Sequence, residues 1–597
     1  MRQYYSKPNL KKLFLRKRVF ILITFLITLI IFAGISWHKF FLAHSQWIPK
    51  DGGIFTDSVV GKINNISPLA PNKSLVDLDL QQLIFSGLLR HNPLTDTIDD
   101  GLATLRISED GKTYFLTLKD SAKFSNGDKV TIEDVLFTFE EVIQNPNFDN
   151  KPLKKAFEYV SFDRIDKDTI AFKILEPNTY FSSLLTTPIL QKKSYQNSLI
   201  EEINDPELPA NKRPLSTGPY ILKNIVHEER GLTRVFLERN PYFFAGKPFI
   251  KQFVFYIYSK FDYLKDDINW TTMYSRLFET EKNKISENLF DEYATREYLL
   301  PRFIGVFFNL DSKKMANPHL RKALLLSTDK KSLLKKEIGW KRIDSVFFFE
   351  GIESWQEANF AEARRLLRDK GFKYNKKEEI RFYKDQPVEL KMITSTSPAV
   401  YSRIAQNMAR TWERELDIKI NLEVLNPAKF QEAVSNRDYD LVFFGQNFSR
   451  NRDILSVWHS SQSGKSNLAN LTNPDIDYLI EEVLFSGTQS DLLTLNQKLE
   501  EIVPAIPIAT PKYELLINRD LLGFSKTFGK IRQHAERFFG IEKWYFEQQR
   551  GWDWPKHQSK FAGFLSWLFN GKKEVKPDYR ETIPPELLEK TDEKKDK

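Results

Sequence analysis

The sequence predicts an α/β fold in two regions, carried behind a single N-terminal transmembrane helix. Three observations lead to this prediction. Residues 19–37 contain no charged residue and follow a strongly basic segment, as expected of a helix that crosses a bilayer. After them, short β-type runs alternate with helical patterns, which indicates βαβ units. A late β-type run, residues 506–518, is expected to return the chain to the first region.

The N-terminal segment predicts a membrane anchor and its orientation. Residues 1–18 carry seven basic residues and no acidic one, and the apolar run is extended by Phe40, Phe41 and Leu42. A helix over 19–42 is long enough to cross a hydrocarbon core of about 30 Å. The basic excess places residues 1–18 in the cytoplasm and the main body outside the cell or in the periplasm. The alternative is a cleaved secretory signal ending near residues 43–45, but we expect the helix to be retained.

Composition excludes several classes of protein. Seven of the nine net positive charges lie in residues 1–18, which leaves +2 over the other 579 residues and argues against a nucleic-acid-binding protein. The chain has no cysteine, so it has no disulfide framework, thiolate metal site or cysteine nucleophile, and no lipid-modified N-terminal cysteine.

The first region is predicted from local patterns. Residues 54–60 alternate like a strand, and residues 76–89 place apolar side chains at helical spacing. Two β-type runs within 104–119 are joined by Asp110-Gly111, a strong hairpin signal. Residues 131–143 start with a threonine cap and an acidic first turn, which predicts a helix. Strand patterns return over 160–174 and 232–258, whereas 261–297 has no assignable pattern.

The second region begins with residues 302–309, which are predicted to form a buried strand. Its predicted helices are 317–336, 357–370, 398–416, 475–485 and 491–503, and its further strands are 388–394, 419–425 and 441–444. Near the C-terminus, residues 556–571 form a short apolar segment that either lies on the membrane or packs on the body. Residues 572–597 are highly charged and are expected to be disordered.

Four groups of residues occur in an order that carries a family resemblance. They are LATLRISEDGKTYFLTLKDSAKFSNGDKVTIEDV at 102–135, STGPY at 216–220 with LERNPYF at 237–243, GVFFNL at 305–310 with LRKAL at 320–324, and WHSSQ at 458–462 with NPDID at 473–477. Together they resemble the extracellular solute-binding proteins of the oligopeptide/dipeptide-binding class, family 5, which serve ABC importers.

The resemblance implies a two-lobed periplasmic-binding-protein-like clamp, of the large peptide-binding type II. On this basis residues 46–300 plus 505–550 form a discontinuous first lobe and 301–504 the second lobe. The expected ligand is a peptide, enclosed between the lobes of a monomer and passed to the permease subunits of an ABC transporter. Most of the matched motifs are typical of turns and helix caps. We therefore expect them to identify the fold without contacting the ligand.

The resemblance also implies which segment binds the ligand. In this family the chain that follows the equivalent of strand 441–444 lines the cleft, its main chain pairs with the peptide, and a nearby aspartate holds the peptide's α-ammonium. The expected ligand-binding residues are Gly445, Gln446, Asn447, Phe448, Ser449, Arg450, Asn451, Asp453 and, at the cleft edge, Trp458.

This segment departs from the family pattern. Gln446 stands where an aromatic residue is frequent, and Ser449 and Asn451 occupy positions where an acidic residue is common. Asp453 is the only carboxylate left, and it is either the ammonium partner or a helix cap. Arg450 and Arg452 raise a different possibility, recognition of an anionic ligand group by guanidinium.

Nothing in the sequence favours catalysis or a cofactor. His459 lies beside Ser460 and Ser461, but adjacent residues rarely form a base–nucleophile pair without a third orienting group. The chain has no phosphate-binding loop, zinc-protease motif or nucleophile elbow, and its eight histidines are scattered singly. We therefore expect no enzyme activity, no metal and no cofactor. The alternatives that remain open are another solute class, such as oligosaccharides or metal chelates, and a degenerate clamp that serves as a surface scaffold.

Overall fold

The computed structural model describes residues 10–71, 73–267, 271–285, 292–353, 357–448, 454–525 and 527–552. These residues fall into two compact units. The larger unit is Gly53–Trp544, and the smaller one combines the segments on either side of it. The predicted apolar segment 556–571 and the charged tail 572–597 lie outside the described residues.

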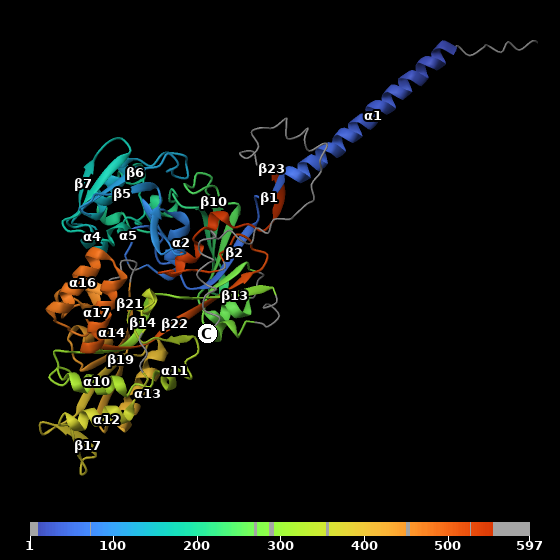
Figure 1. Cartoon of the computed structure of the whole chain (residues 1–597). Helices are drawn as coiled ribbons and strands as arrows, with labels where there is room; N and C mark the ends of the chain where they lie inside the picture. The colour runs from blue at the N-terminus through green and yellow to red at the C-terminus, as the bar shows by residue number, and fades with distance from the viewer. Residues whose placement is uncertain are drawn as a thin grey trace, which may run out of the picture. The chain divides into compact units, whose positions relative to one another are not determined.

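The smaller unit is built on one long helix, α1 (Leu10–His44), the blue helix in Figure 1. Its stretch Lys17–Leu42 has a mean hydropathy of 2.8 and is not buried, so by length and composition it can cross a membrane. Strands β1 (Ser45–Pro49) and β23 (Gln548–Trp552) follow as an antiparallel pair. The Arg550 guanidinium donates a 2.7 Å hydrogen bond to the Leu42 carbonyl and lies 5.2 Å from the centre of the Trp47 ring. Strand β23 therefore also holds the end of the helix.

A twelve-stranded sheet runs through the larger unit in the order β20-β19-β21-β14-β22-β12-β2-β11-β10-β9, with β13 and β15 paired to β22 beside this path. In strand β22, residues 505–509 pair with β14 and residues 512–518 pair with β13, so one strand joins the two halves of the sheet. The bounds are β2 (Ile54–Val60), β9 (Tyr220–His227), β10 (Leu232–Arg239), β11 (Gln252–Tyr258), β12 (Met273–Leu277), β13 (Tyr293–Leu299), β14 (Arg302–Phe308), β15 (Trp340–Arg342), β19 (Glu389–Ser395), β20 (Lys419–Leu425), β21 (Leu441–Asn447) and β22 (Ala505–Asn518).

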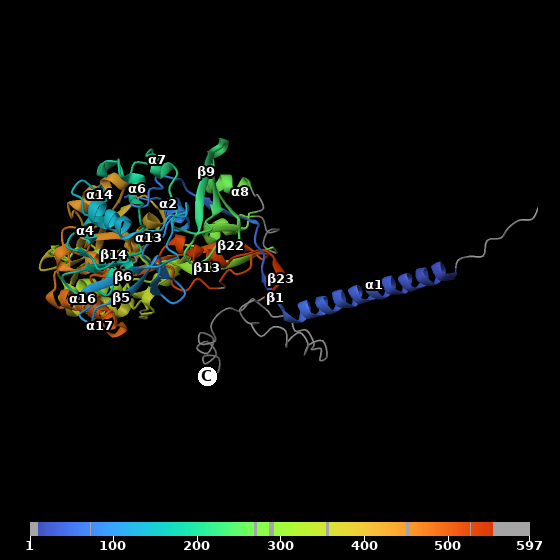
Figure 2. The same ribbon diagram turned by 90° about the horizontal axis from the view of Figure 1, so that it is seen from above.

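The first half of the larger unit has its own core and a second, four-stranded sheet in the order β5-β6-β8-β7. Helix α8 lies beside β11 and β2. Figure 2 shows this half turned by 90° from Figure 1. The elements of this half are α2 (Leu75–Ile84), β3 (Leu89–Asn92), β4 (Thr97–Asp100), β5 (Ala103–Ile107), β6 (Thr113–Leu118), α3 (Ile132–Leu136), a π-helical segment (Phe137–Ile143), α4 (Lys151–Ala156), β7 (Ser161–Arg164), β8 (Thr169–Lys173), α5 (Phe181–Leu184), α6 (Lys192–Tyr195), α7 (Pro209–Lys212), α8 (Phe261–Asp266) and α9 (Glu279–Lys282).

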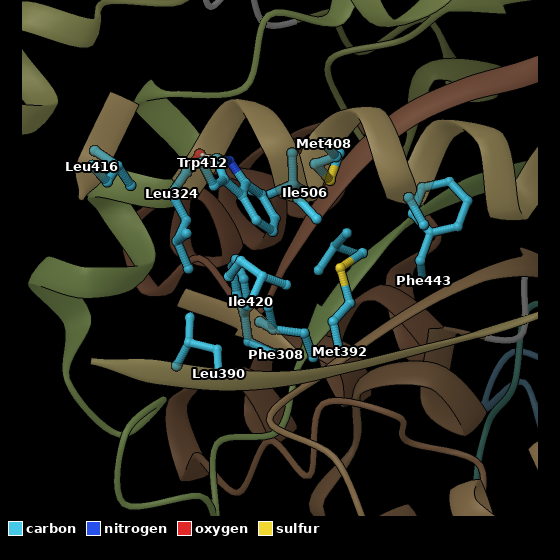
Figure 3. Close-up of a cluster of buried hydrophobic side chains, with 14 of the residues drawn as sticks. Phe308, Leu324, Leu390, Met392, Met408, Trp412, Leu416, Ile420, Phe443 and Ile506 are labelled. Atoms are coloured by element: carbon cyan, nitrogen blue, oxygen red, sulfur yellow. Dashed lines mark hydrogen bonds between the residues drawn. The ribbon is translucent and has the colours of Figure 1, made fainter. Parts of the chain in front are cut away.

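The second half packs helices on both sides of β19, β20 and β21. In Figure 3, Trp412 and Met408 of α13 and Leu324 of α10 meet Met392 and Phe308 from the strands. The Trp412 indole donates hydrogen bonds to the Leu324 carbonyl (3.0 Å) and the Thr328 hydroxyl (3.2 Å), which satisfies its one buried polar atom. The helices are α10 (Pro318–Leu326), α11 (Lys330–Leu334), α12 (Phe360–Asp369), α13 (Ala399–Leu416), α14 (Pro427–Ser435), α15 (Ile454–Trp458), α16 (Pro474–Ser486) and α17 (Gln489–Ile502), and a small sheet contains β16 (Lys373–Asn375), β17 (Ile380–Tyr383) and β18 (Gln386–Pro387).

Most predicted elements are confirmed, and three predicted helices differ. The predicted helix 76–89 ends at Ile84, and Leu89 begins strand β3. The predicted helix 131–143 begins with a capping box at Thr131, as expected, but continues as the π-helical segment from Phe137. The predicted helix 317–336 is two helices, α10 and α11, because Asp329 accepts a hydrogen bond from the Ser332 amide and starts a new helix. The unassigned stretch 261–297 contains α8, β12, α9 and β13.

Candidate functional site

The predicted site segment begins inside strand β21, whose last three residues are Gly445, Gln446 and Asn447. Strand β21 pairs antiparallel with β14, and in this register Gly445 lies opposite Ile304, Gln446 opposite Phe303 and Asn447 opposite Arg302. Strand β14 in turn pairs with β22 near the point where β22 passes from one half of the sheet to the other. The segment therefore leaves the sheet close to the junction of the two halves. Four of the expected ligand-binding residues, Ser449, Arg450, Asn451 and Asp453, lie outside the described residues, as does Arg452.

Gly445 allows a close approach by the side chain of Tyr401. A Cβ atom at residue 445 would lie 2.4 Å from the Tyr401 hydroxyl oxygen, closer than real Cβ contacts allow. Burial raises the pKa of Tyr401, and the positive charge of Arg302 partly opposes this. Tyr401 therefore keeps its proton and presents a hydroxyl group beside the main chain of β21.

Two expected site residues, Phe448 and Trp458, are placed in the core of the second half. Phe448 is 7% exposed and stacks on Phe303, with ring centres 5.8 Å apart. Trp458 is 1% exposed, and its ring centre lies 6.0 Å from that of Phe307. Contact between these side chains and a ligand would require them to leave the core. Gln446 and Asn447, by contrast, are half-buried and exposed.

A group of residues that the sequence analysis missed surrounds the same junction. It consists of Tyr298, Arg302, Tyr401, Tyr513 and His534, and we call it the junction cluster. The Arg302 guanidinium lies 5.4 Å from the centre of the Tyr513 ring. It makes no hydrogen bond or ion pair with any residue that the structure describes. One signal in the sequence could have identified Arg302: it is a charged residue at the first position of a strand that is predicted to be buried.

His534 is the most buried member of the junction cluster, at 3% exposed. Its Nδ1 lies 2.7 Å from the Tyr298 hydroxyl oxygen, and its ring meets the Tyr513 ring edge to face at 4.5 Å. Burial, together with the charges of Arg276, Arg537 and Arg302, holds the pKa of His534 well below its ordinary value, so the imidazole is neutral. Of these three arginines, Arg276 and Arg537 are paired with the buried carboxylates of Asp57 and Asp79. Arg302 has no ionic partner among the described residues.

An ionic network connects the two halves at another point. The Arg532 guanidinium donates to both Asp96 carboxylate oxygens at 2.9 Å, and to Glu350 at 3.2 Å. Lys530 Nζ lies 3.4 Å from Asp96 and 3.3 Å from Glu350. Asp96 belongs to the β3–β4 turn of the first half, whereas Glu350 follows Phe347, which packs in a core of the second half. We call Asp96, Glu350, Lys530 and Arg532 the bridging network.

The geometry around His459 is that of a turn. His459 Nδ1 accepts a hydrogen bond from the Ser461 amide at 3.0 Å, and the Asp477 carboxylate accepts one from the Ser460 amide at 2.8 Å. These contacts order a 3₁₀ turn, Ser460–Gln462. In the part of the chain that the structure describes, no group of three or more His, Cys, Asp or Glu residues is arranged to hold a metal ion.

Residues 97–467 match the family model of the bacterial extracellular solute-binding proteins, family 5. This match covers more than half of the chain, so the chain belongs to that family of binding proteins. Among curated proteins it is similar to the oligopeptide-binding protein AppA of Bacillus subtilis, with 21% identity over 529 residues that cover 83% of this chain and 92% of the relative.

Solved structures show the same fold. B. subtilis AppA in complex with a nonapeptide has a TM-score of 0.63 and 18% identity, and the match covers 84% of this chain and 100% of that one. NikZ from Campylobacter jejuni, in complex with Ni(L-His), has a TM-score of 0.63 and 19% identity over 83% of this chain and 100% of that one. The chain therefore has the two-lobed α/β fold that was expected. The exact lobe boundaries stay a prediction.

Proposed function

We propose that this chain is a membrane-anchored extracellular solute-binding protein that captures peptides and delivers them to an ABC-type importer. The observation that carries the proposal is the match to family 5 over residues 97–467, in a chain with one apolar helix before its two lobes. The peptide as ligand is supported by relatives such as B. subtilis AppA, which is an oligopeptide-binding protein. Anchoring raises the local concentration of the receptor near the permease, so modest affinity can support uptake.

The direct test is to purify the full chain in detergent and to identify bound molecules by mass spectrometry. Peptides that co-purify with it and exchange with added peptide support the proposal. Other solutes, such as a metal chelate, would assign a different ligand class. A chain that retains and binds no solute would indicate a scaffold.

We further propose that α1 is retained, with residues 1–18 in the cytoplasm and the lobes outside. The basic flank and the apolar stretch Lys17–Leu42 support this orientation. N-terminal sequencing of protein isolated from membranes should find residue 1 or 2. A mature N-terminus near residues 44–46 would identify a cleaved signal instead.

The site proposal is that the main chain of Gly445, Gln446 and Asn447 pairs with the peptide and that Asp453 holds its α-ammonium. Asp453→Asn should then weaken peptide binding by about 1.5–3 kcal/mol, the range of a charge-assisted hydrogen bond. N-acetylation of the peptide should weaken binding to the wild type and have little effect on the variant. Equal losses in both proteins would mean that the ammonium is held elsewhere.

The junction cluster supplies a partner for the other end of the ligand. Arg302 is a half-buried cation with no ionic partner among the described residues, and it lies opposite Asn447 in the sheet. We assign it to a carboxylate of the ligand. Arg302→Gln should weaken a peptide with a free C-terminus and have little effect on the same peptide as a C-terminal amide. A wild-type protein that binds both forms equally would contradict this role without affecting the peptide proposal.

A further inference from the structure

A cavity of about 120 Å³ lies inside the first lobe, apart from the junction cluster. Its walls come from five stretches that are separate in sequence: residues 78–91, residues 186–188, Pro219, Phe243 with Phe244, and residues 533–542. None of the five residues of the junction cluster lines it. Since a cavity of about 150 Å³ accepts benzene, this one suits a ligand of about five to seven non-hydrogen atoms.

Glu542 is a buried, unpaired carboxylate in the wall of this cavity. It lies in the 3₁₀ turn Ile541–Lys543 and is 6% exposed. Its carboxylate makes no hydrogen bond or ion pair with any residue that the structure describes. Its carboxylate oxygens are not among the fully buried side-chain atoms of the described residues, so they are open to the cavity. Its position in the cavity wall suits a positively charged ligand group.

Arg90 supplies the opposite charge in the same cavity. Its guanidinium lies between two aromatic rings, 5.4 Å from the centre of Phe244 and 5.1 Å from that of Phe539. Its Nε is buried and has no hydrogen-bond acceptor among the described residues. Contacts with ring faces leave the N–H groups free to bind an acceptor.

Arg90 and Glu542 line one cavity but do not form an ion pair with each other. We propose that this cavity binds a small zwitterion, a free α-amino acid with a small side chain, whose carboxylate binds Arg90 and whose ammonium binds Glu542. A simple anion would leave Glu542 unpaired, and a simple cation would leave Arg90 unpaired. Only a ligand with both charges neutralises the two residues at once. This site is separate from the proposed peptide site and does not depend on it.

Calorimetric titration of the full chain in detergent with glycine, L-alanine and L-serine tests the proposal. Alanine should bind saturably, and acetate or ethylammonium, which carry one charge each, should bind at least about tenfold more weakly. Glu542→Gln and Arg90→Gln should each weaken alanine binding at least about tenfold. Matched controls are Glu176→Gln and Arg106→Gln, an exposed carboxylate and an exposed arginine that also lies on a phenylalanine ring, and both should bind alanine as the wild type does.

A second readout separates a ligand role from a structural one. Glu542→Gln should not lower the Tm of the ligand-free protein, because the carboxylate has no partner among the described residues to lose, and alanine should raise the Tm of the wild type only. A lower Tm in the variant would show that Glu542 has a structural partner and would overturn the proposal. So would alanine binding that a saturating peptide displaces, or a crystal structure grown with saturating alanine that holds only water in the cavity.

Discussion

Single residues in this chain carry charge into the interior, and Lys73 gives the clearest pH-dependent case. Its ammonium donates hydrogen bonds to the Pro68 carbonyl and to the Gln81 side chain. Burial lowers the pKa of Lys73 from 10.5 to about 7, although Asp77 opposes the shift. The folded protein therefore disfavours the charged form more than the unfolded chain does.

This shift predicts a measurable pH dependence. Between about pH 7 and 10.5 the unfolded chain binds a proton at Lys73 that the folded chain does not. The free energy of unfolding should therefore rise with pH over this window. Lys73→Met removes this contribution. The difference in unfolding free energy between wild type and variant, measured by urea denaturation at several pH values, should shift in favour of the wild type from pH 7 to 10. A pH-independent difference would contradict the prediction.

Gly445 permits a second prediction at this scale. Gly445→Ala places a Cβ where the Tyr401 hydroxyl lies, which should destabilise the protein by about 1–3 kcal/mol, the usual cost of overpacking. Tyr401→Phe removes that hydroxyl, so the double variant should recover most of the loss. Urea denaturation of both single variants and the double variant measures the coupling. Additive losses would mean that the clash is with another group.

The sequence indicated the position of the candidate site but not all of its side chains. The pattern at 441–444 predicted a strand that stops before Gly445, whereas strand β21 continues through Gly445, Gln446 and Asn447. Phe448 and Trp458 lie in the core because both side chains are large and apolar. A sequence motif shared with a family does not indicate the direction in which a side chain points. Arg302, Tyr513 and His534 could not be grouped from the sequence, because more than 200 residues separate the first from the others.

At the scale of elements, sequence patterns predicted a helix or turn correctly where hydrogen bonds within the segment itself define that element. The Asp110-Gly111 hairpin and the Thr131 capping box are both present. The missed boundary between α10 and α11 was also local, since Thr328 donates back to the Leu324 carbonyl and Asp329 caps the next helix. Strands β12 and β13 showed no recognisable sequence pattern because they are defined by pairing with β22. All five residues of β12 are buried, so the strand has no alternation of buried and exposed residues.

The pairing of β1 with β23 leads to a prediction about the anchor. Truncation after Trp544 removes β23, together with the Arg550 contacts to Leu42 and Trp47. Residues 45–50 should then be cut faster by trypsin at Lys50 and by chymotrypsin at Trp47, because their backbone loses its partner strand. Truncation after residue 555 keeps β23 and serves as the control. Equal cleavage rates in the two truncated proteins would mean that β23 does not protect this segment.

At the scale of the whole molecule, the bridging network connects the lobes through charge. Burial alone would raise the pKa of Asp96, but the His91 hydrogen bond and Arg532 hold it well below its ordinary value. The contact should therefore persist at neutral pH and be lost only as the pH falls far into the acid range. Because Arg532 contacts both lobes, it stabilises the arrangement in which they meet.

Asp96→Asn and Glu350→Gln should each shift the lobes toward a more open arrangement. Small-angle scattering without added peptide should give a larger radius of gyration for either variant than for the wild type, and the double variant should show less than the sum of the two effects, since both act through Arg532. Glu176→Gln, which breaks an exposed ion pair with Lys112, is the control and should leave the radius unchanged. Unchanged scattering in both variants would show that other contacts hold the lobes together.

Strand β22 has a consequence for how the protein is made. Residues 505–509 complete the sheet of the second lobe and residues 512–518 complete that of the first, so neither lobe can close its sheet until the chain has been synthesised and exported to about residue 518. Contacts between segments this distant in sequence form slowly and leave strand edges open in the meantime. Both halves of the twelve-stranded sheet therefore stay incomplete until this one late strand has been synthesised.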